Sequence, residues 1–290
     1  MGSQLSRRAA LAALAGFGGG ALVGCAPERA VRPRLLDPIS VPPFEAPVAV
    51  TPPPPPAIDV EAVILANEHR SLVAWGTDFA GVVRTGAEAG HATPGAVFLT
   101  LDACGGPVGS GFDEALISGL RAAGIPATLF LNLRWIRANP DLAAGLAADP
   151  LFSIQNHGSA HLPLSVTGAS AYGIPGTTNA RSAAMEVWEN HVAIEQLTGI
   201  APRWFRPGTA HLDDVGLSIA EGLGERIAGF AINGDGGATL PAEAVAGAVS
   251  GAVGGELIIA HMNQPMSGSA AGILAGARTL RDRGIAFGVL

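Results

Sequence analysis

Polar residues that can do acid–base or metal chemistry stand at the ends of several short apolar runs in the sequence. They are Asp102, Cys104, His157, His161, Arg206, Asp235 and His261. Carboxylate and imidazole groups exchange protons, and neutral imidazole or thiolate binds divalent metals. An arginine beside a carboxylate keeps that carboxylate charged. One such residue after a strand is usually structural, but so many at successive strand ends predict a catalytic site.

The segments that must position these residues alternate between strand-like and helix-like patterns from about residue 59. Apolar runs of strand length occur at 97–101, 127–132, 152–155, 203–207, 227–232, 257–261 and 286–290. Amphipathic stretches lie between them, and several end in glycine, as helices often do. This alternation predicts an α/β fold, a distorted (β/α) barrel of about seven parallel strands similar to a TIM barrel. The carboxyl ends of the strands would then bring the polar residues to one face.

Five motifs in chain order resemble those of a known family. They are TLDAC, NHGSAH, FRPG, NGDGG and IIAHM, and the resemblance covers about residues 95–290. The chain is similar to the polysaccharide deacetylases with the NodB homology domain, carbohydrate esterase family four. This resemblance implies a barrel that binds a divalent metal, usually zinc. It also implies removal of acetyl groups, mostly N-acetyl, from an envelope or extracellular polysaccharide by metal-activated water.

The resemblance implies a role for each matching residue of the proton-transfer machinery. Asp102 matches the general base, and Arg206 matches the residue that positions this base. His261 matches the general acid, with Asp235 as its partner. Ile259 stands where the family has an apolar residue that contacts the acetyl methyl group.

The first motif departs from the family pattern, because Ala103 replaces the second of two adjacent acids. In the family that acid is the third protein ligand of the metal, beside two histidines that match His157 and His161. We predict that a divalent metal, zinc above all, still binds here, with Asp102, Cys104 or water completing the site. The alternative is that Cys104 is a small buried residue without a ligand role.

Residues 163–180 form an insertion rich in glycine, serine and threonine after the second metal histidine. It holds Tyr172, which we predict to stack on a sugar from a lid or groove wall; the alternative is a surface loop without substrate contact. Trp204 is the tryptophan expected to contact substrate, because it precedes Arg206 by two residues on the same strand face. Residues 59–94 are predicted to cover the bottom or an open edge of the barrel.

The N-terminal residues have the pattern of an export signal followed by a tether. In residues 1–24 a basic start with a weak twin-arginine pattern precedes an apolar stretch, and LVGC resembles a lipobox that ends at Cys25. This predicts cleavage before Cys25 and lipid attachment to its sulfur; a plain secretory signal is the alternative. Residues 25–58 are rich in proline and predict an extended tether, and 59–290 form the catalytic domain. The expected location is therefore a membrane-anchored lipoprotein, periplasmic or associated with the outer membrane.

The amino-acid composition limits the classes of partner that the protein can bind. The net charge is −7, and all 17 basic residues are arginines without basic runs, which argues against nucleic acid. No stripe at helical spacing indicates a protein partner, so we predict a monomer acting on an acetylated polysaccharide. Two other functions stay open, a metal-independent amide hydrolase of the same fold and a non-catalytic glycan-binding lipoprotein. We favour the metal-dependent deacetylase because both a base and an acid, each with its partner, are present.

Overall fold

The computed structural model describes residues 57–91 and 95–290, so the predicted export signal and nearly all of the predicted tether lie outside the described residues. The strands are β1 (Trp75–Gly76), β2 (Val97–Ala103), β3 (Ala127–Leu131), β4 (Phe152–Asn156), β5 (Trp204–Phe205), β6 (Leu212–Asp213), β7 (Arg226–Ile227), β8 (Ile232–Asn233), β9 (Leu257–His261) and β10 (Phe287–Gly288). The helices are α1 (Val60–Asn67), α2 (Gly86–Ala89), α3 (Glu114–Ala123), α4 (Leu133–Ala138), α5 (Pro140–Ala147), α6 (Ala180–Thr198), α7 (Asp214–Gly222), α8 (Ala242–Ser250), α9 (Ser269–Asp282) and the 3₁₀ turn η1 (Gly208–Ala210).

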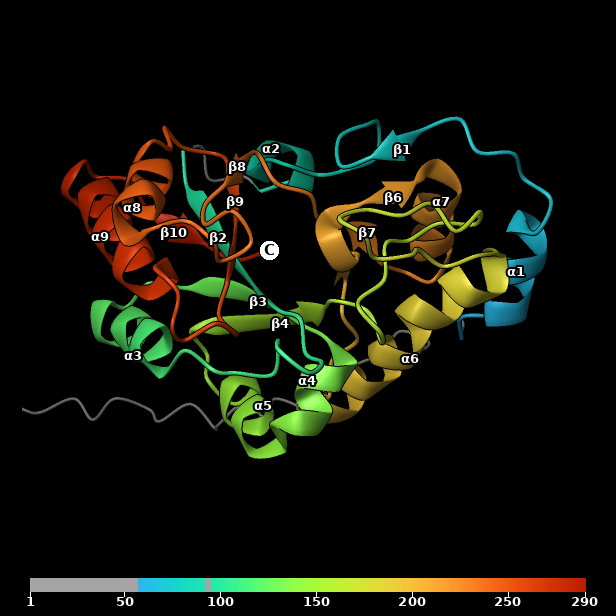
Figure 1. Ribbon diagram of the computed structural model, residues 1–290, viewed down its shortest axis with the longest axis horizontal. Coiled ribbons are helices and arrows are strands. Elements are labelled where there is room, and N and C mark those ends of the chain that lie inside the picture. The colour runs from blue at the N-terminus through green and yellow to red at the C-terminus, as the bar shows by residue number, and fades with distance from the viewer. Residues whose placement is uncertain (1–56, 92–94) are drawn as a thin grey trace, which may run out of the picture. The chain divides into compact units, whose positions relative to one another are not determined.

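One curled parallel sheet carries the polar strand ends. Within the described residues its order is β7-β5-β4-β3-β2-β9-β8, and β10 pairs in parallel with the start of β2. Helices cover the outside of this half-barrel, with α8 and α9 toward one end and α1, α6 and α7 toward the other (Figure 1). The predicted α/β fold, a distorted barrel of about seven parallel strands, is confirmed.

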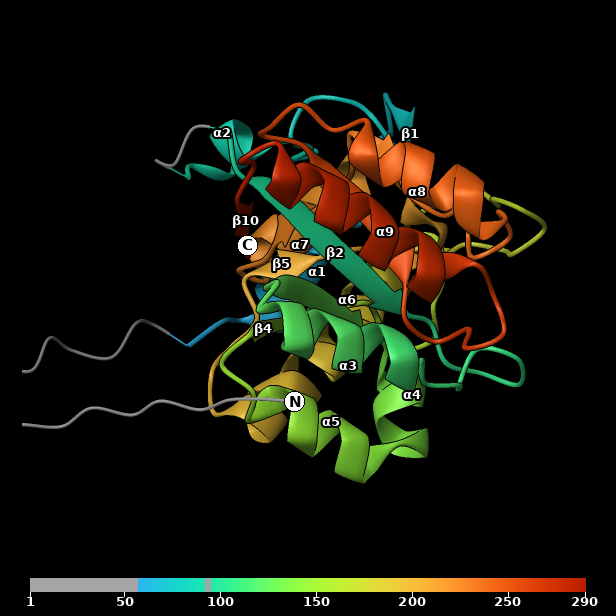
Figure 2. The ribbon, with the colours of Figure 1, turned by 90° about the vertical axis from the view of Figure 1, so that its left-hand side faces the viewer.

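The strand β2 is buried along its whole length because both of its faces are covered. Its alternate residues Val97, Leu99 and Leu101 belong to an apolar cluster with α3, α8 and α9. Figure 2 shows α3 and α9 on this face of the strand. Phe98 lies in a second cluster, inside the curl of the sheet. Because side chains alternate along a strand, Asp102 shares the inner side with Phe98.

The N-terminal extension bridges the two sides of the curled sheet. The amide of Val83 donates to the carbonyl oxygen of Ile227, the last residue of β7, at 3.0 Å. One residue later, Arg84 O accepts from the amide of Leu257 at 2.9 Å, at the start of β9. These bonds satisfy backbone groups that open strand edges would leave unpaired. The extension therefore covers an open edge, one of the two places that its sequence predicts.

In the part of the chain that the structure describes, no helix is both long enough and apolar enough to cross a membrane.

Candidate active site

A cavity of about 730 Å³ opens where the strands of the curled sheet end. Four of the residues singled out in the sequence line it, namely Asp102, Cys104, His161 and His261. The other three, His157, Arg206 and Asp235, lie behind this wall and are each buried at 1% exposure or less. The parallel sheet thus brings all of the polar strand ends to one place.

Asp102 is held as a charged carboxylate by Arg206. Its Oδ1 accepts a hydrogen bond from Arg206 Nη1 at 2.7 Å, and both side chains are buried. Its Nε donates to Ala228 O and its Nη2 to Gly229 O, and its Cζ lies 4.2 Å from the centroid of the Phe130 ring. Burial alone would raise the pKa of Asp102, but the positive charge of Arg206 lowers it below its usual value. The carboxylate is therefore available as a base at neutral pH.

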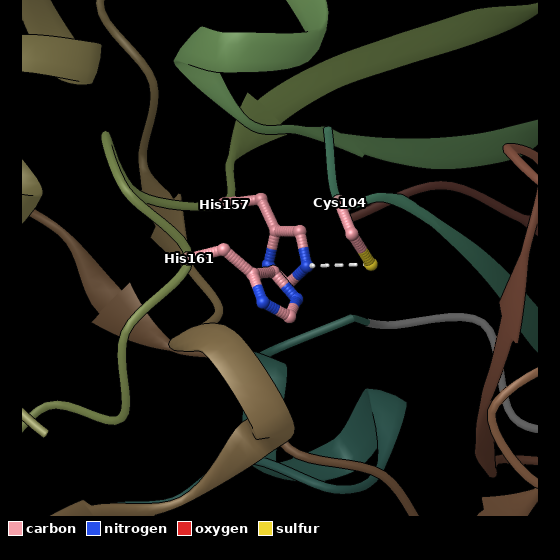
Figure 3. Close-up of side chains that lie close together, drawn as sticks. All are labelled: Cys104, His157 and His161. Atoms are coloured by element: carbon pink, nitrogen blue, oxygen red, sulfur yellow. Dashed lines mark hydrogen bonds between the residues drawn. The ribbon is translucent and has the colours of Figure 1, made fainter. Parts of the chain in front are cut away.

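Cys104, His157 and His161 form a cluster whose potential ligand atoms all lie within 4.8 Å of one another. The sulfur of Cys104 is 3.8 Å from His157 Nε2, as Figure 3 shows. His157 Nδ1 lies 2.8 Å from Arg206 O. A carbonyl only accepts, so Nδ1 carries the proton and the lone pair of neutral His157 is on Nε2, facing the sulfur.

The donor set of this cluster fits zinc. Burial alone would raise the pKa of the Cys104 thiol, but hydrogen bonds with His157 and His161 lower it well below its usual value. A thiolate and two imidazoles are common zinc ligands, and three protein ligands leave a position open for water, as in catalytic zinc sites. Of the candidates weighed from the sequence, Cys104 is the one whose ligand atom lies within 4.8 Å of both histidines. Asp102 Oδ2 also approaches His157 Nε2, at 3.7 Å, but Asp102 is outside this group and its Oδ1 is engaged by Arg206.

The short turn after β2 explains why Cys104 reaches the histidines. Ala103 is fully buried in the apolar cluster beneath the helices. Gly105 and Gly106 follow with φ values of 69° and 85°, in the left-handed region that favours glycine. A Cβ on Gly105 would lie 2.6 Å from the backbone nitrogen of Trp135. The turn therefore depends on the two glycines, and it directs Cys104 to the cavity.

His261 is a charged acid held by Asp235. Its Nδ1 lies 2.9 Å from Asp235 Oδ1, and its backbone amide donates to Oδ2 at 2.8 Å. Ser269 Oγ also donates to Oδ2 at 2.8 Å. Burial lowers the pKa of His261, but Asp235 and Cys104 together outweigh it, and the pKa lies well above its usual value. Because Nδ1 is engaged by Asp235, the free nitrogen is Nε2, which can give a proton.

A buried glutamate that the sequence analysis missed holds the loop between the two histidines of the cluster. Glu186 of α6 is 3% exposed, and its carboxylate accepts from the amides of Ala160 and Leu162 at 2.9–3.1 Å. It also accepts from Ser159 Oγ at 3.0 Å. His161 lies between these amides with a φ of 62°, unusual for a residue other than glycine. The signal in the sequence was an acid on the apolar face of a helix.

Replacing Glu186 with glutamine is expected to weaken zinc binding by about 10- to 100-fold, the usual effect of losing a group that orients a metal ligand. Glutamine keeps one acceptor oxygen in place of two, and its amide nitrogen cannot accept from the loop amides, so the segment that carries His161 is held less firmly. Calorimetric titration of metal-free protein with zinc measures this. Glu189→Gln is the control, because Glu189 is on the same helix but exposed. Unchanged affinity in a folded Glu186→Gln variant would show that the carboxylate does not orient the cluster.

The predicted substrate-contact residues lie in different places. Ile259 and Tyr172 both line the cavity. Tyr172 is 83% exposed, and its ring meets that of His211 edge-on, with centroids 5.4 Å apart. Trp204 does not line this cavity: it is buried in the inner apolar cluster, with Arg226 stacked 4.6 Å from its ring centroid. The prediction that Trp204 contacts substrate is corrected, because Trp204 is 6% exposed and, like Arg206 on the same strand face, does not line the cavity.

Comparison with known protein families identifies the family to which most of the described sheet belongs. Residues 89–228 match the sequence profile of the family described as polysaccharide deacetylase. This segment therefore belongs to the polysaccharide deacetylase family, as the motifs predict. The comparison with curated proteins gives no match.

Three solved structures illustrate the similarity. A family 4 carbohydrate esterase from Streptomyces lividans, in complex with acetate, is 26% identical, with a TM-score of 0.56 over 67% of this chain and 92% of that one. The Bc1960 peptidoglycan N-acetylglucosamine deacetylase is 20% identical, with a TM-score of 0.57 over 68% and 89%. BA3943, a CE4 family pseudoenzyme from Bacillus anthracis, is 20% identical, with a TM-score of 0.56 over 69% and 65%. The fold is thus that of carbohydrate esterase family four, which includes both enzymes and a pseudoenzyme.

Proposed function

We propose that this protein removes acetyl groups, N-acetyl above all, from an envelope or extracellular polysaccharide. The supporting observation is that a charged base, a charged acid and a cluster fit for zinc meet at one cavity. A non-catalytic glycan-binding protein has no need for a base and an acid that are each held by a buried partner.

In this proposal the side chains divide the work of amide hydrolysis. Asp102 takes a proton from the attacking water, and Arg206 keeps the carboxylate charged and oriented. His261 then gives its Nε2 proton to the departing amine, while Asp235 holds the ring. Ile259 offers an apolar contact for the acetyl methyl group. A divalent metal held by Cys104, His157 and His161 would supply Lewis acidity for the acetyl carbonyl and the water.

The proposal includes a place of action. Export and lipid attachment at Cys25 would anchor the protein to a membrane, and the proline-rich segment 25–58 would hold the domain away from its surface. The periplasm or the outer membrane is the expected location. A membrane leash suits a polymeric substrate of the envelope better than a small diffusible amide.

Acetate release tests this function. Purified protein is incubated with acetylated chito-oligosaccharides, peptidoglycan fragments and acetylxylan, as the zinc or cobalt form and after chelation. We expect release that depends on the metal and returns when the metal is restored. Release that persists without metal would instead indicate the metal-independent hydrolase. Absence of acetate release from all three substrates with folded, metal-loaded protein would favour the non-catalytic glycan-binding protein.

A further inference from the structure

Arg134 is a cationic side chain on the cavity wall that the proposed chemistry does not use. Asn132 caps α4, accepting from the amide of Arg134 at 3.0 Å and from its Nε at 3.3 Å. The Nη2 of Arg134 donates to Cys104 O at 3.3 Å. Arg134 is half-buried and lines the cavity. These contacts fix the guanidinium in place without neutralising its charge.

The charge of Arg134 is unmatched among the described residues. Within that part of the chain Arg84, Arg121, Arg181 and Arg206 each pair with a carboxylate, whereas no carboxylate lies within ion-pair distance of Arg134. Asp102 is the one acid among the described residues of the cavity wall, and Arg206 already balances it. Apart from the Cys104 thiolate, which belongs to the proposed metal cluster, the described cavity wall therefore presents Arg134 to a ligand with no carboxylate to balance its charge.

The glycines after β2 make room for this guanidinium. A Cβ on Gly106 would lie 3.3 Å from Arg134 Nη1, and one on Gly105 would lie 2.9 Å from the Cβ of Arg134. Nη1 makes no hydrogen bond to any described residue, so its donors are free for a ligand. Guanidinium groups bind carboxylates with paired, charge-assisted hydrogen bonds, and a half-buried one is screened less by solvent than an exposed one.

Cys104 links this cation to the proposed reaction centre. Its carbonyl oxygen accepts from Arg134, and its sulfur lies 3.8 Å from His157 Nε2. A group that binds the guanidinium would therefore belong to the sugar at the cluster or to its neighbour in the glycan. Charge and proximity together point to the chemistry of the substrate.

We propose that Arg134 binds a carboxylate of the substrate, so that the preferred substrate is an acidic glycan with its carboxylate on the acetylated sugar or the adjacent one. The proposal rests on the deacetylase function and names its substrate class. A uronic acid and a sugar bearing a lactyl ether both offer this carboxylate. Neutral acetylated glycans would fill the cavity without using the charge of Arg134.

Matched substrates test this preference. Acetylated oligosaccharides that contain a hexuronic acid, or a lactyl-ether sugar, are compared with the same compounds as carboxyl methyl esters. With the metal-loaded wild-type protein, kcat/KM is expected to be about 10- to 100-fold higher for at least one acid than for its ester. In Arg134→Gln this ratio should fall close to one, mainly through KM, and Arg134→Lys should restore part of it. The acid that shows the preference identifies the source of the carboxylate. Equal kcat/KM for acid and ester in both pairs would overturn the proposal and leave the deacetylase function standing.

Arg137→Gln is the matched control, because Arg137 lies on the same helix but is exposed and away from the cavity wall. It should keep the wild-type ratio. A loss of the ratio in Arg137→Gln equal to that in Arg134→Gln would also contradict the proposal, since it would point to a general charge effect.

Binding separates this proposal from the function on which it rests. Calorimetric titration with the same acids and esters measures the charge preference without turnover. If no substrate releases acetate but the acid binds more tightly than the ester, and Arg134→Gln abolishes the difference, the deacetylase function fails and the acidic-glycan site stands. If acid and ester bind equally well, or if neither binds, the acidic-glycan site is wrong.

Discussion

Replacing Asp102 with asparagine is expected to lower kcat/KM for acetate release by about 10²- to 10⁴-fold, the range of a lost general base. Asparagine has nearly the same shape and still accepts from Arg206, but it cannot take a proton. The loss should appear in kcat as well as in kcat/KM, because the base acts in the transition state. Steady-state kinetics on the metal-loaded variant measure both.

A second buried carboxylate provides the control for this substitution. Asp113 is 2% exposed and caps α3 through a 3.0 Å bond from the amide of Leu116. Asp113→Asn keeps the cap and lies outside the cavity, so its activity should match the wild type. Asp102→Asn also leaves the charge of Arg206 buried without its counterion, which costs up to about 3–5 kcal/mol of stability. Thermal unfolding must therefore show that the variant is folded at the assay temperature, and a folded variant with near-wild-type kcat would remove Asp102 from the role of base.

The strand ends could be predicted from the sequence because a parallel sheet leaves few alternatives. Once the runs before Asp102, His157 and His261 are strands of one parallel sheet, their carboxyl ends must lie on one side. The motif order then indicated the family. Depth along a strand was harder to predict, and Trp204 shows why. The alternation of side chains along a strand predicts which side of the sheet a residue faces. It does not predict whether the side chain reaches the cavity, because that depends on how the neighbouring strand ends and loops cover it.

Glu186 and Arg134 could not be predicted, because their roles come from contacts between distant segments. Glu186 reaches Ala160 only because α6 packs beside the end of β4, and a helical pattern does not say which loop lies opposite an acid. Arg134 became notable only when the cavity wall showed no carboxylate to balance it among the described residues. The choice between Asp102 and Cys104 as the third member of the cluster also depended on the turn at Gly105, whose close approach to Trp135 no local pattern shows.

Replacing Cys104 with alanine is expected to weaken zinc binding by more than about 100-fold, which is beyond the usual loss for a group that only orients a ligand. A cluster reduced to His157 and His161 has two protein ligands, whereas catalytic zinc sites usually have three. Calorimetry with zinc measures the affinity, and the spectrum of the cobalt form should lose its sulfur-to-metal absorption. Acetate release at a metal concentration that saturates only the wild type should fall to the level of the chelated protein.

Cys104→Asp distinguishes the loss of a ligand from damage to the turn. A carboxylate also binds zinc and is the ligand type that the family places beside the two histidines, so this variant should regain most of the affinity that the alanine variant loses. Its cobalt spectrum should still lack the sulfur absorption. If Cys104→Ala binds zinc as tightly as the wild type, the thiol is only a small side chain packed beside the glycines. Asp102 or water would then have to complete the site, and the close approach of the Cys104 sulfur to His157 Nε2 would have no role in holding the metal.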